Sequence, residues 1–136
     1  MAVYRFRVSF EDYDDVERDI DLKSNHTFED LHKAIHGSTG YKIDASSSFY
    51  VSNDQWIKND EIAFLPNQRK INNGVALMEN SKLSSFIDDP HQKFYYIYNF
   101  DRPFDFHVEL IKIMLNEEPG KSYPNIARSL GESPKI

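Results

Sequence analysis

Two segments near the start of the chain, in which apolar and charged side chains alternate, restrict the fold more than any other feature. Residues 3–10 alternate throughout, and residues 16–23 repeat the pattern after the polar stretch of residues 11–15. A period of two is typical of a β-strand with one buried and one exposed face. The sequence therefore predicts a β-hairpin over residues 3–23.

The register of this hairpin follows from both of its faces. If the turn centres on Tyr13, basic residues of the first strand lie opposite acidic residues of the second, and apolar residues lie opposite each other on the other face. The expected pairs are Arg5–Asp21, Arg7–Asp19, Phe6–Ile20 and Tyr4–Leu22. A single register thus satisfies the charged and the apolar face together.

A helix of about three turns is predicted to follow the hairpin. Thr27 and Asp30 have the spacing of a capping box, in which each side chain binds a backbone amide at the start of the helix. The side chains that we expect to be buried are Phe28, Leu31 and Ile35. Gly37 and then Gly40 supply the left-handed conformation that ends such helices.

The remaining segments contain shorter strands and loops. Residues 49–51 are predicted to form a strand, residues 58–74 a variable loop with a short strand around 62–65, and residues 81–87 a short helix capped by Ser81. Residues 94–100 are aromatic on both faces, which is typical of a central strand that is covered on both sides. Residues 106–113 complete a second hairpin, and residues 116–136 are expected to form an irregular tail.

The fold class that follows is α+β within a single domain of residues 1–136. We expect a mixed, mostly antiparallel sheet that begins in the order β-β-α-β, as in a β-grasp fold, with one main helix packed on the sheet and a hairpin toward the C-terminus.

Composition excludes several classes of function. The 136 residues contain no cysteine, which excludes disulfide bonds, thiolate zinc sites and thiol nucleophiles. The net charge of -6 repels phosphate backbones, so nucleic-acid binding would need a local basic patch. No apolar run has the length of a membrane span, and the chain opens with a strand pattern and not with a signal peptide. We therefore expect a cytoplasmic protein without membrane contact.

The order of the segments resembles a known family. The landmarks are Leu31-His32-Lys33-Ala34-Ile35, Gly40-Tyr41, the aromatic run of residues 94–100, and Tyr123-Pro124. They are similar to those of the plasmid pRiA ORF-three-like family, whose members are also called TnpR-like transposon passenger proteins. The resemblance covers nearly the whole chain and implies a shared fold, but no established reaction.

The chain departs from the pattern of that family after Tyr98, which makes it a divergent member. The family usually carries Tyr-Asp-Phe-Gly-Asp, then a Trp and a His two residues later, and a Cys-rich ending. This chain has other residues at those places, namely Asn99, Asp101, Arg102, Phe104 and Phe106, and has no cysteine after Tyr123-Pro124.

The best candidate site lies between the two aromatic strands. Turns beside a rigid sheet commonly carry function, and the polar residues here are Asn99, Asp101, Arg102, Asp105 and His107. Asp101 and Asp105 with His107 nearby have the residue types of an acid and base pair, although a polar turn between strands explains them more simply. We predict a binding site here and no catalytic residues.

Other constellations of polar residues have simple structural explanations. His32 and His36 have the i, i+4 spacing of a helical metal pair, but no HExxH motif surrounds them, so we expect packed histidines and no bound metal. The acidic residues 11–17 lack the glycine and terminal glutamate of a calcium-binding loop. Glycine-rich phosphate loops, dinucleotide fingerprints and nucleophile elbows are absent from the sequence.

Three functional hypotheses remain. The first is a non-catalytic interaction domain without a cofactor, which binds a protein partner through the tip at residues 101–105 and the loop at residues 58–74. The second is a nucleic-acid-associated protein of mobile-element origin, suggested by the family label and by tyrosines 95, 96 and 98. The third is an enzyme whose active-site residues converge only in the fold.

Overall fold

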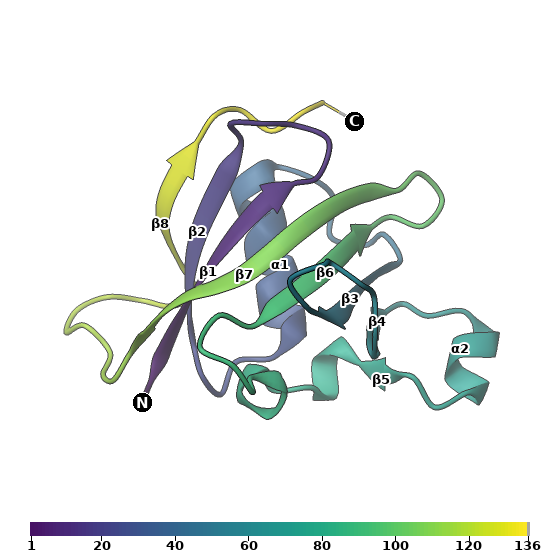
Figure 1. Ribbon diagram of the computed structural model, residues 1–136, viewed down its shortest axis with the longest axis horizontal. Coiled ribbons are helices and arrows are strands. Elements are labelled where there is room, and N and C mark those ends of the chain that lie inside the picture. The colour runs from purple at the N-terminus through teal and green to yellow at the C-terminus, as the bar shows by residue number, and fades with distance from the viewer. Residues whose placement is uncertain (136) are drawn as a thin grey trace.

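The computed structural model describes residues 1–135, and its main feature is an eight-stranded sheet with one helix against one face (Figure 1). The strands are β1 (Val3–Phe10), β2 (Glu17–Lys23), β3 (Ser47–Ser52), β4 (Glu61–Phe64), β5 (Ala76–Leu77), β6 (Lys93–Tyr98), β7 (Phe104–Met114) and β8 (Asn125–Leu130). The helices are α1 (Phe28–Thr39), α2 (Gln68–Asn72) and the 3₁₀ turns η1 (Met78–Asn80) and η2 (Leu83–Phe86).

The strands lie in the order β5-β4-β3-β6-β7-β1-β2-β8. Neighbouring strands are antiparallel, except β4 and β5, which are parallel. The β-β-α-β start, the single main helix on the sheet and the second hairpin, β6–β7, confirm the predicted α+β class. The aromatic strand β6 lies in the middle of the sheet, as its sequence predicted.

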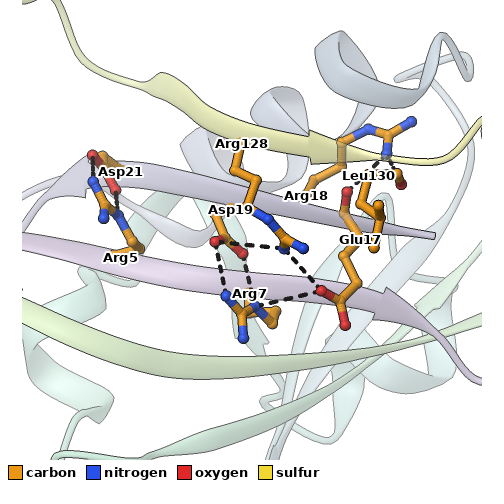
Figure 2. Close-up of polar contacts among 8 residues, drawn as sticks. All are labelled: Arg5, Arg7, Glu17, Arg18, Asp19, Asp21, Arg128 and Leu130. Atoms are coloured by element: carbon orange, nitrogen blue, oxygen red, sulfur yellow. Dashed lines mark hydrogen bonds and ion pairs between the residues drawn. The ribbon is translucent and has the colours of Figure 1, made fainter. Parts of the chain in front are cut away.

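The register of the first hairpin is as predicted. Arg5 lies opposite Asp21 and Arg7 opposite Asp19. Each arginine donates two hydrogen bonds to its aspartate, at 2.8 and 3.0 Å for Arg5 and at 2.9 and 3.0 Å for Arg7 (Figure 2). The aspartate side chains are only 2% and 6% exposed, so these pairs provide the partners that two nearly buried carboxylates require.

Helix α1 begins at the predicted capping box. The Thr27 amide donates to the Asp30 carboxylate at 2.9 Å, and the Asp30 amide donates to the Thr27 hydroxyl at 3.3 Å. The helix passes through Gly37 and ends only at Gly40, whose φ of 82° is left-handed and whose amide donates to the His36 carbonyl. Gly37 therefore does not help to end the helix, because its backbone is helical.

The core lies between α1 and the sheet and is rich in aromatic rings. The predicted stripe of Phe28, Leu31 and Ile35 is fully buried. It packs on the apolar faces of the central strands, including Phe6, Phe49, Phe94, Tyr96 and Phe106. On the other face of β6, Tyr95 is also buried, while Ile97 is half-buried.

Two segments differ from their predicted structure because local hydrogen bonds of the backbone and of polar side chains organise them. Residues 81–87 contain the short 3₁₀ turn η2, which no side chain caps. Ser81 does not act as the expected cap. Its carbonyl accepts from the Phe28 amide, and its hydroxyl donates to the Leu77 carbonyl at 2.7 Å. Residues 58–74 contain the predicted strand as β4 and also α2, which begins at an Asn67 side-chain cap.

The segment 116–136, expected to be irregular, contributes β8 at the edge of the sheet. Most side chains of β8 are exposed, so the segment has no alternating apolar pattern to reveal it. Contacts with β2 hold it instead. Arg128 donates to the Glu17 carboxylate at 2.9 Å, and Arg18 donates to the Leu130 carbonyl at 2.8 Å (Figure 2).

Within residues 1–135, no helix has both the length and the apolar character needed to cross a membrane.

Candidate functional site

The turn between β6 and β7 contributes to an open pocket beyond the C-terminal end of α1. Three segments that are distant in the sequence form it: residues 39–42 after α1, residues 98–102 at the end of β6, of which Tyr98, Asn99 and Arg102 line it, and residues 133–135. The pocket has a volume of about 570 Å³, which lies in the range of small-molecule sites. We call it the cationic pocket, for the charges described below.

Two tyrosines form a rigid wall of the cationic pocket. The rings of Tyr41 and Tyr98 stack with centroids 5.5 Å apart and planes 16° from parallel. The Tyr41 hydroxyl donates to the Pro134 carbonyl at 2.6 Å, and the Tyr98 hydroxyl donates to the Lys42 carbonyl at 2.7 Å. Burial raises the pKa of Tyr41 to about 12 and also raises the pKa of Tyr98, so both hydroxyls stay neutral donors. The wall thus ties the three segments together.

The charged side chains that line this pocket are all basic. They are Lys42, Arg102 and Lys135, and all three are exposed. Among residues 1–135, no carboxylate lies within ion-pair distance of any of them. Other basic residues of this acidic chain, such as Arg5, Arg7 and Lys93, are paired. The lining of the pocket therefore presents three positive charges and no negative charge, although the chain as a whole has a net charge of -6.

The turn itself is held in one conformation. Asn99 has a left-handed φ of 61°, which asparagine tolerates better than most residues. Its amide donates to the Ser47 hydroxyl at 3.1 Å, and its carbonyl accepts from the Arg102 amide at 3.0 Å. The backbone that carries Arg102 is thus anchored to β3, which positions this residue at the rim of the pocket. Asp101 is exposed in the same turn and does not line the pocket.

The sheet separates the other two predicted residues from this pocket. Asp105 and His107 project from β7 to the face opposite α1, beside Tyr95. The Tyr95 hydroxyl lies 2.7 Å from Asp105 Oδ2 and 2.8 Å from Glu11 Oε2. The His107 ring stacks on Trp56 at 3.9 Å, and its Nε2 atom lies 3.6 Å from Glu11 Oε1.

The five residues predicted as one binding site therefore occupy three places. Asn99 and Arg102 line the cationic pocket, Asp101 is exposed in the turn, and Asp105 and His107 lie on the other face of the sheet. Asp101, Asp105, His107 and His32 line neither the cationic pocket nor the three other main pockets of residues 1–135. The hypothetical acid and base pair is thus not gathered in any of these four pockets.

His32 and His36 form a buried hydrogen-bond chain through Tyr96. His32 Nε2 donates to the Ile43 carbonyl at 3.0 Å, which leaves Nδ1 to accept from the Tyr96 hydroxyl at 2.7 Å. The tyrosine oxygen in turn accepts from His36 Nε2 at 3.0 Å. The His36 Nδ1 atom is buried and has no hydrogen-bond partner in the part of the chain that the structure describes.

Burial keeps this chain of contacts neutral. It lowers the pKa of His32 to about 4 and that of His36 to about 3, because the charged imidazolium is poorly solvated there. No group of three or more His, Cys, Asp or Glu side chains with the geometry of a metal site occurs in residues 1–135. The two histidines contribute to the core through Tyr96, a contact that their helical spacing alone does not reveal.

The fold and the pocket define a small α+β domain in which one helix covers one face of a mostly antiparallel sheet, with an open basic pocket past the end of that helix. The chain belongs to the plasmid pRiA4b ORF-3-like protein family, whose sequence pattern matches residues 2–135. This assignment agrees with the resemblance noted in the sequence. No curated protein matches the chain.

A solved structure shares the fold. It is the crystal structure of a protein of unknown function from Methanosarcina mazei Go1, with a TM-score of 0.78 and 24% sequence identity. The similarity covers 94% of this chain and 68% of the other. At this identity the comparison supports the architecture of the sheet and helix, and says nothing about activity.

Proposed function

We propose that the protein is a non-catalytic binding domain, and that its cationic pocket holds a ligand that carries a carboxylate or phosphate group. The observation that carries this proposal is the set of three exposed cations, Lys42, Arg102 and Lys135, which line one preformed pocket without ion-pair partners among residues 1–135. A planar guanidinium beside two ammonium groups suits an oxyanion with several acceptor atoms.

The two tyrosines add a second requirement for the ligand. Their rings are already stacked and their hydroxyls are already bonded to carbonyls, so the wall does not need to reorganise when a ligand enters. An apolar or aromatic part of the ligand would gain contact area against Tyr41, the half-buried ring of this wall, which the buried Tyr98 supports from behind. We therefore expect an aromatic oxyanion to bind more tightly than inorganic phosphate.

An acidic segment of a protein partner would also supply carboxylate groups for the cationic pocket. A protein is the class of partner that the sequence favours. Titration calorimetry of the full chain with inorganic phosphate, phenyl phosphate and an oligoglutamate peptide distinguishes a small anionic ligand from an acidic protein segment. Tighter binding of the peptide than of phenyl phosphate would identify a protein partner, whereas the reverse order would identify a small ligand.

Charge reversal provides the matched test of the site. Two unit charges about 4 Å apart attract each other by about 1 kcal/mol when both are fully solvated, so removing one exposed cation should weaken binding about fivefold. We expect Arg102→Glu and Lys42→Glu each to exceed this loss, because they also introduce repulsion. Lys112→Glu makes the same change of charge at an exposed residue of β7 outside the pocket, and should leave affinity nearly unchanged. Equal losses in all three variants would contradict the proposal.

A nucleic-acid partner is a less favoured proposal. The tyrosines that suggested it, Tyr95, Tyr96 and Tyr98, are at most 3% exposed, so their rings offer no surface for stacked bases. A phosphate backbone would nevertheless compete for the cationic pocket. A single-stranded oligonucleotide in the same calorimetric series measures this, and binding that weakens steeply with salt would favour the nucleic acid.

We also propose that the protein acts in the cytoplasm and that its family has a mobile-element, TnpR-like origin, of which this chain is a divergent member. The absence of cysteine is compatible with a reducing compartment, and the family name refers to a plasmid. Fractionation of source cells and inspection of the genes that adjoin its coding sequence test these two statements.

A further inference from the structure

A second pocket lies near the other end of α1 and has the opposite character. It is about 330 Å³ in volume, and its apolar wall comes from the end of β4, from α2 and from the segment after it: Phe64, Leu65, Pro66, Ile71, Leu77 and Met78. Figure 1 shows α2 and β5 together on one side of the molecule, away from the C-terminus and the β6–β7 turn. We call this site the apolar pocket.

Two apolar side chains of this pocket are about half exposed. Leu65 is 54% exposed and Ile71 is 52% exposed, although other large apolar residues near them, such as Ile62 and Met78, are completely buried. An exposed pair of this kind around a concavity is typical of a surface that a partner covers.

The backbone at Leu65 supports the same interpretation. Its φ of 52° is left-handed, which for leucine costs roughly 1–2 kcal/mol. The Ser46 hydroxyl donates to the Leu65 carbonyl at 2.9 Å and holds this conformation. Strained residues of this kind concentrate at binding sites, where the fold presents a side chain in a fixed position.

The charges at the pocket specify the partner. Both charged residues that line it are acidic, Glu29 on α1 and Glu79 on η1. Glu29 has a loose contact of 3.8 Å with Lys33, and Glu79 is exposed and has no ion pair among residues 1–135. An apolar pocket flanked by two carboxylates complements an apolar side chain that is followed or preceded by a lysine or arginine.

We propose that the apolar pocket docks a short segment of a protein partner, which inserts an apolar side chain between Leu65 and Ile71 and places a basic residue against Glu29 and Glu79. This site is independent of the cationic pocket, because the two pockets share no residue and differ in sign of charge. One chain can thus hold an oxyanion and a basic segment at the same time.

The test is a selection of displayed random short peptides against the immobilised full chain. Recovered peptides should be enriched in an aliphatic or aromatic residue adjacent to Lys or Arg, and this enrichment should be lost in Ile71→Glu, a change at an exposed position that leaves the core intact. The result that overturns the proposal is a recovered set with no such pattern, or one that the Ile71→Glu variant recovers equally well.

Charge reversal at Glu79 provides a sharper second measurement. Glu79→Lys should weaken a selected basic peptide about tenfold or more and improve the binding of the same peptide with glutamate in place of its basic residue. Asp12→Lys makes the same change of net charge at the exposed hairpin tip and should change neither affinity. Identical effects of Glu79→Lys and Asp12→Lys would refute a role for Glu79. The Arg102→Glu variant should bind the selected peptide unchanged, which would show that the peptide does not bind in the cationic pocket.

Discussion

Replacing Tyr96 by phenylalanine tests the account of the buried hydrogen-bond chain most sharply. The Tyr96 hydroxyl donates to His32 Nδ1 and accepts from His36 Nε2, and the tyrosine is completely buried. The substitution removes a single oxygen and leaves the ring in place. Any loss of stability therefore reports on the polar contacts of this hydroxyl, chiefly those with the two histidines, and not on a change of packing.

The expected loss follows from the groups left without partners. A buried polar group that loses its hydrogen bond costs about 1–3 kcal/mol, so two orphaned nitrogens would cost about 2–6 kcal/mol. The two histidines are close enough to compensate partly, because His36 Nε2 lies 3.3 Å from His32 Nδ1 and can donate to it directly. We therefore expect Tyr96→Phe to destabilise the protein by about 2–3 kcal/mol.

The assay is urea unfolding near neutral pH, with Tyr98→Phe as the matched control. The Tyr98 hydroxyl makes one hydrogen bond, to the carbonyl of the exposed Lys42, so its removal should cost about 1 kcal/mol. If Tyr96→Phe costs no more than Tyr98→Phe, the proposed chain of contacts does not contribute to stability in the way described.

Three further predictions concern stability. Folding lowers the pKa values of His32 and His36 from 6.5 to about 4 and about 3, so the unfolded state binds more protons than the folded state below pH 6.5. The free energy of unfolding should therefore be lower at pH 5 than at pH 7 by about 2 kcal/mol per histidine. A free energy of unfolding that does not change between pH 5 and pH 7 would contradict this prediction. Asp21→Ala should cost about 1–3 kcal/mol in urea unfolding, because it removes a nearly buried carboxylate that accepts two charged hydrogen bonds. Gly131→Ala should lower the melting temperature more than Gly74→Ala: both glycines have positive φ, but a Cβ at Gly131 would collide with the Asp15 backbone, whereas Gly74 faces open space.

The sequence predicts elements well where burial and local chemistry agree. The first hairpin has one register that pairs Arg5 with Asp21 and Phe6 with Ile20, so a shift by one residue would bury charges. The start of α1 is equally determined, because the capping box involves only Thr27 and its near neighbours. Strand β8 has no comparable signal, because its own side chains are mostly exposed. Its position depends on strand pairing and side-chain contacts with β2, which is distant in the sequence.

The candidate site was only partly predictable for a similar reason. Asn99 and Arg102, which line the cationic pocket, were predicted because they lie in a polar turn between two strands. Lys42 and Lys135 reach the same pocket from segments that are remote in sequence. The alternation of side chains along β7 could have shown that Asp105 and His107 lie away from the pocket. Both alternate with the buried Phe106 and Val108 and therefore lie on the opposite face of the sheet.

The most direct test of the central claim is an amide chemical-shift titration of the isotope-labelled full chain with phenyl phosphate. The account predicts saturable shifts concentrated in residues 39–42, residues 98–102 and residues 133–135, which lie together only in the folded pocket. These shifts should be lost in Arg102→Glu and retained in Lys112→Glu. Shifts that do not saturate, or that occur mainly elsewhere on the molecule, would contradict the assignment of the cationic pocket as the binding site.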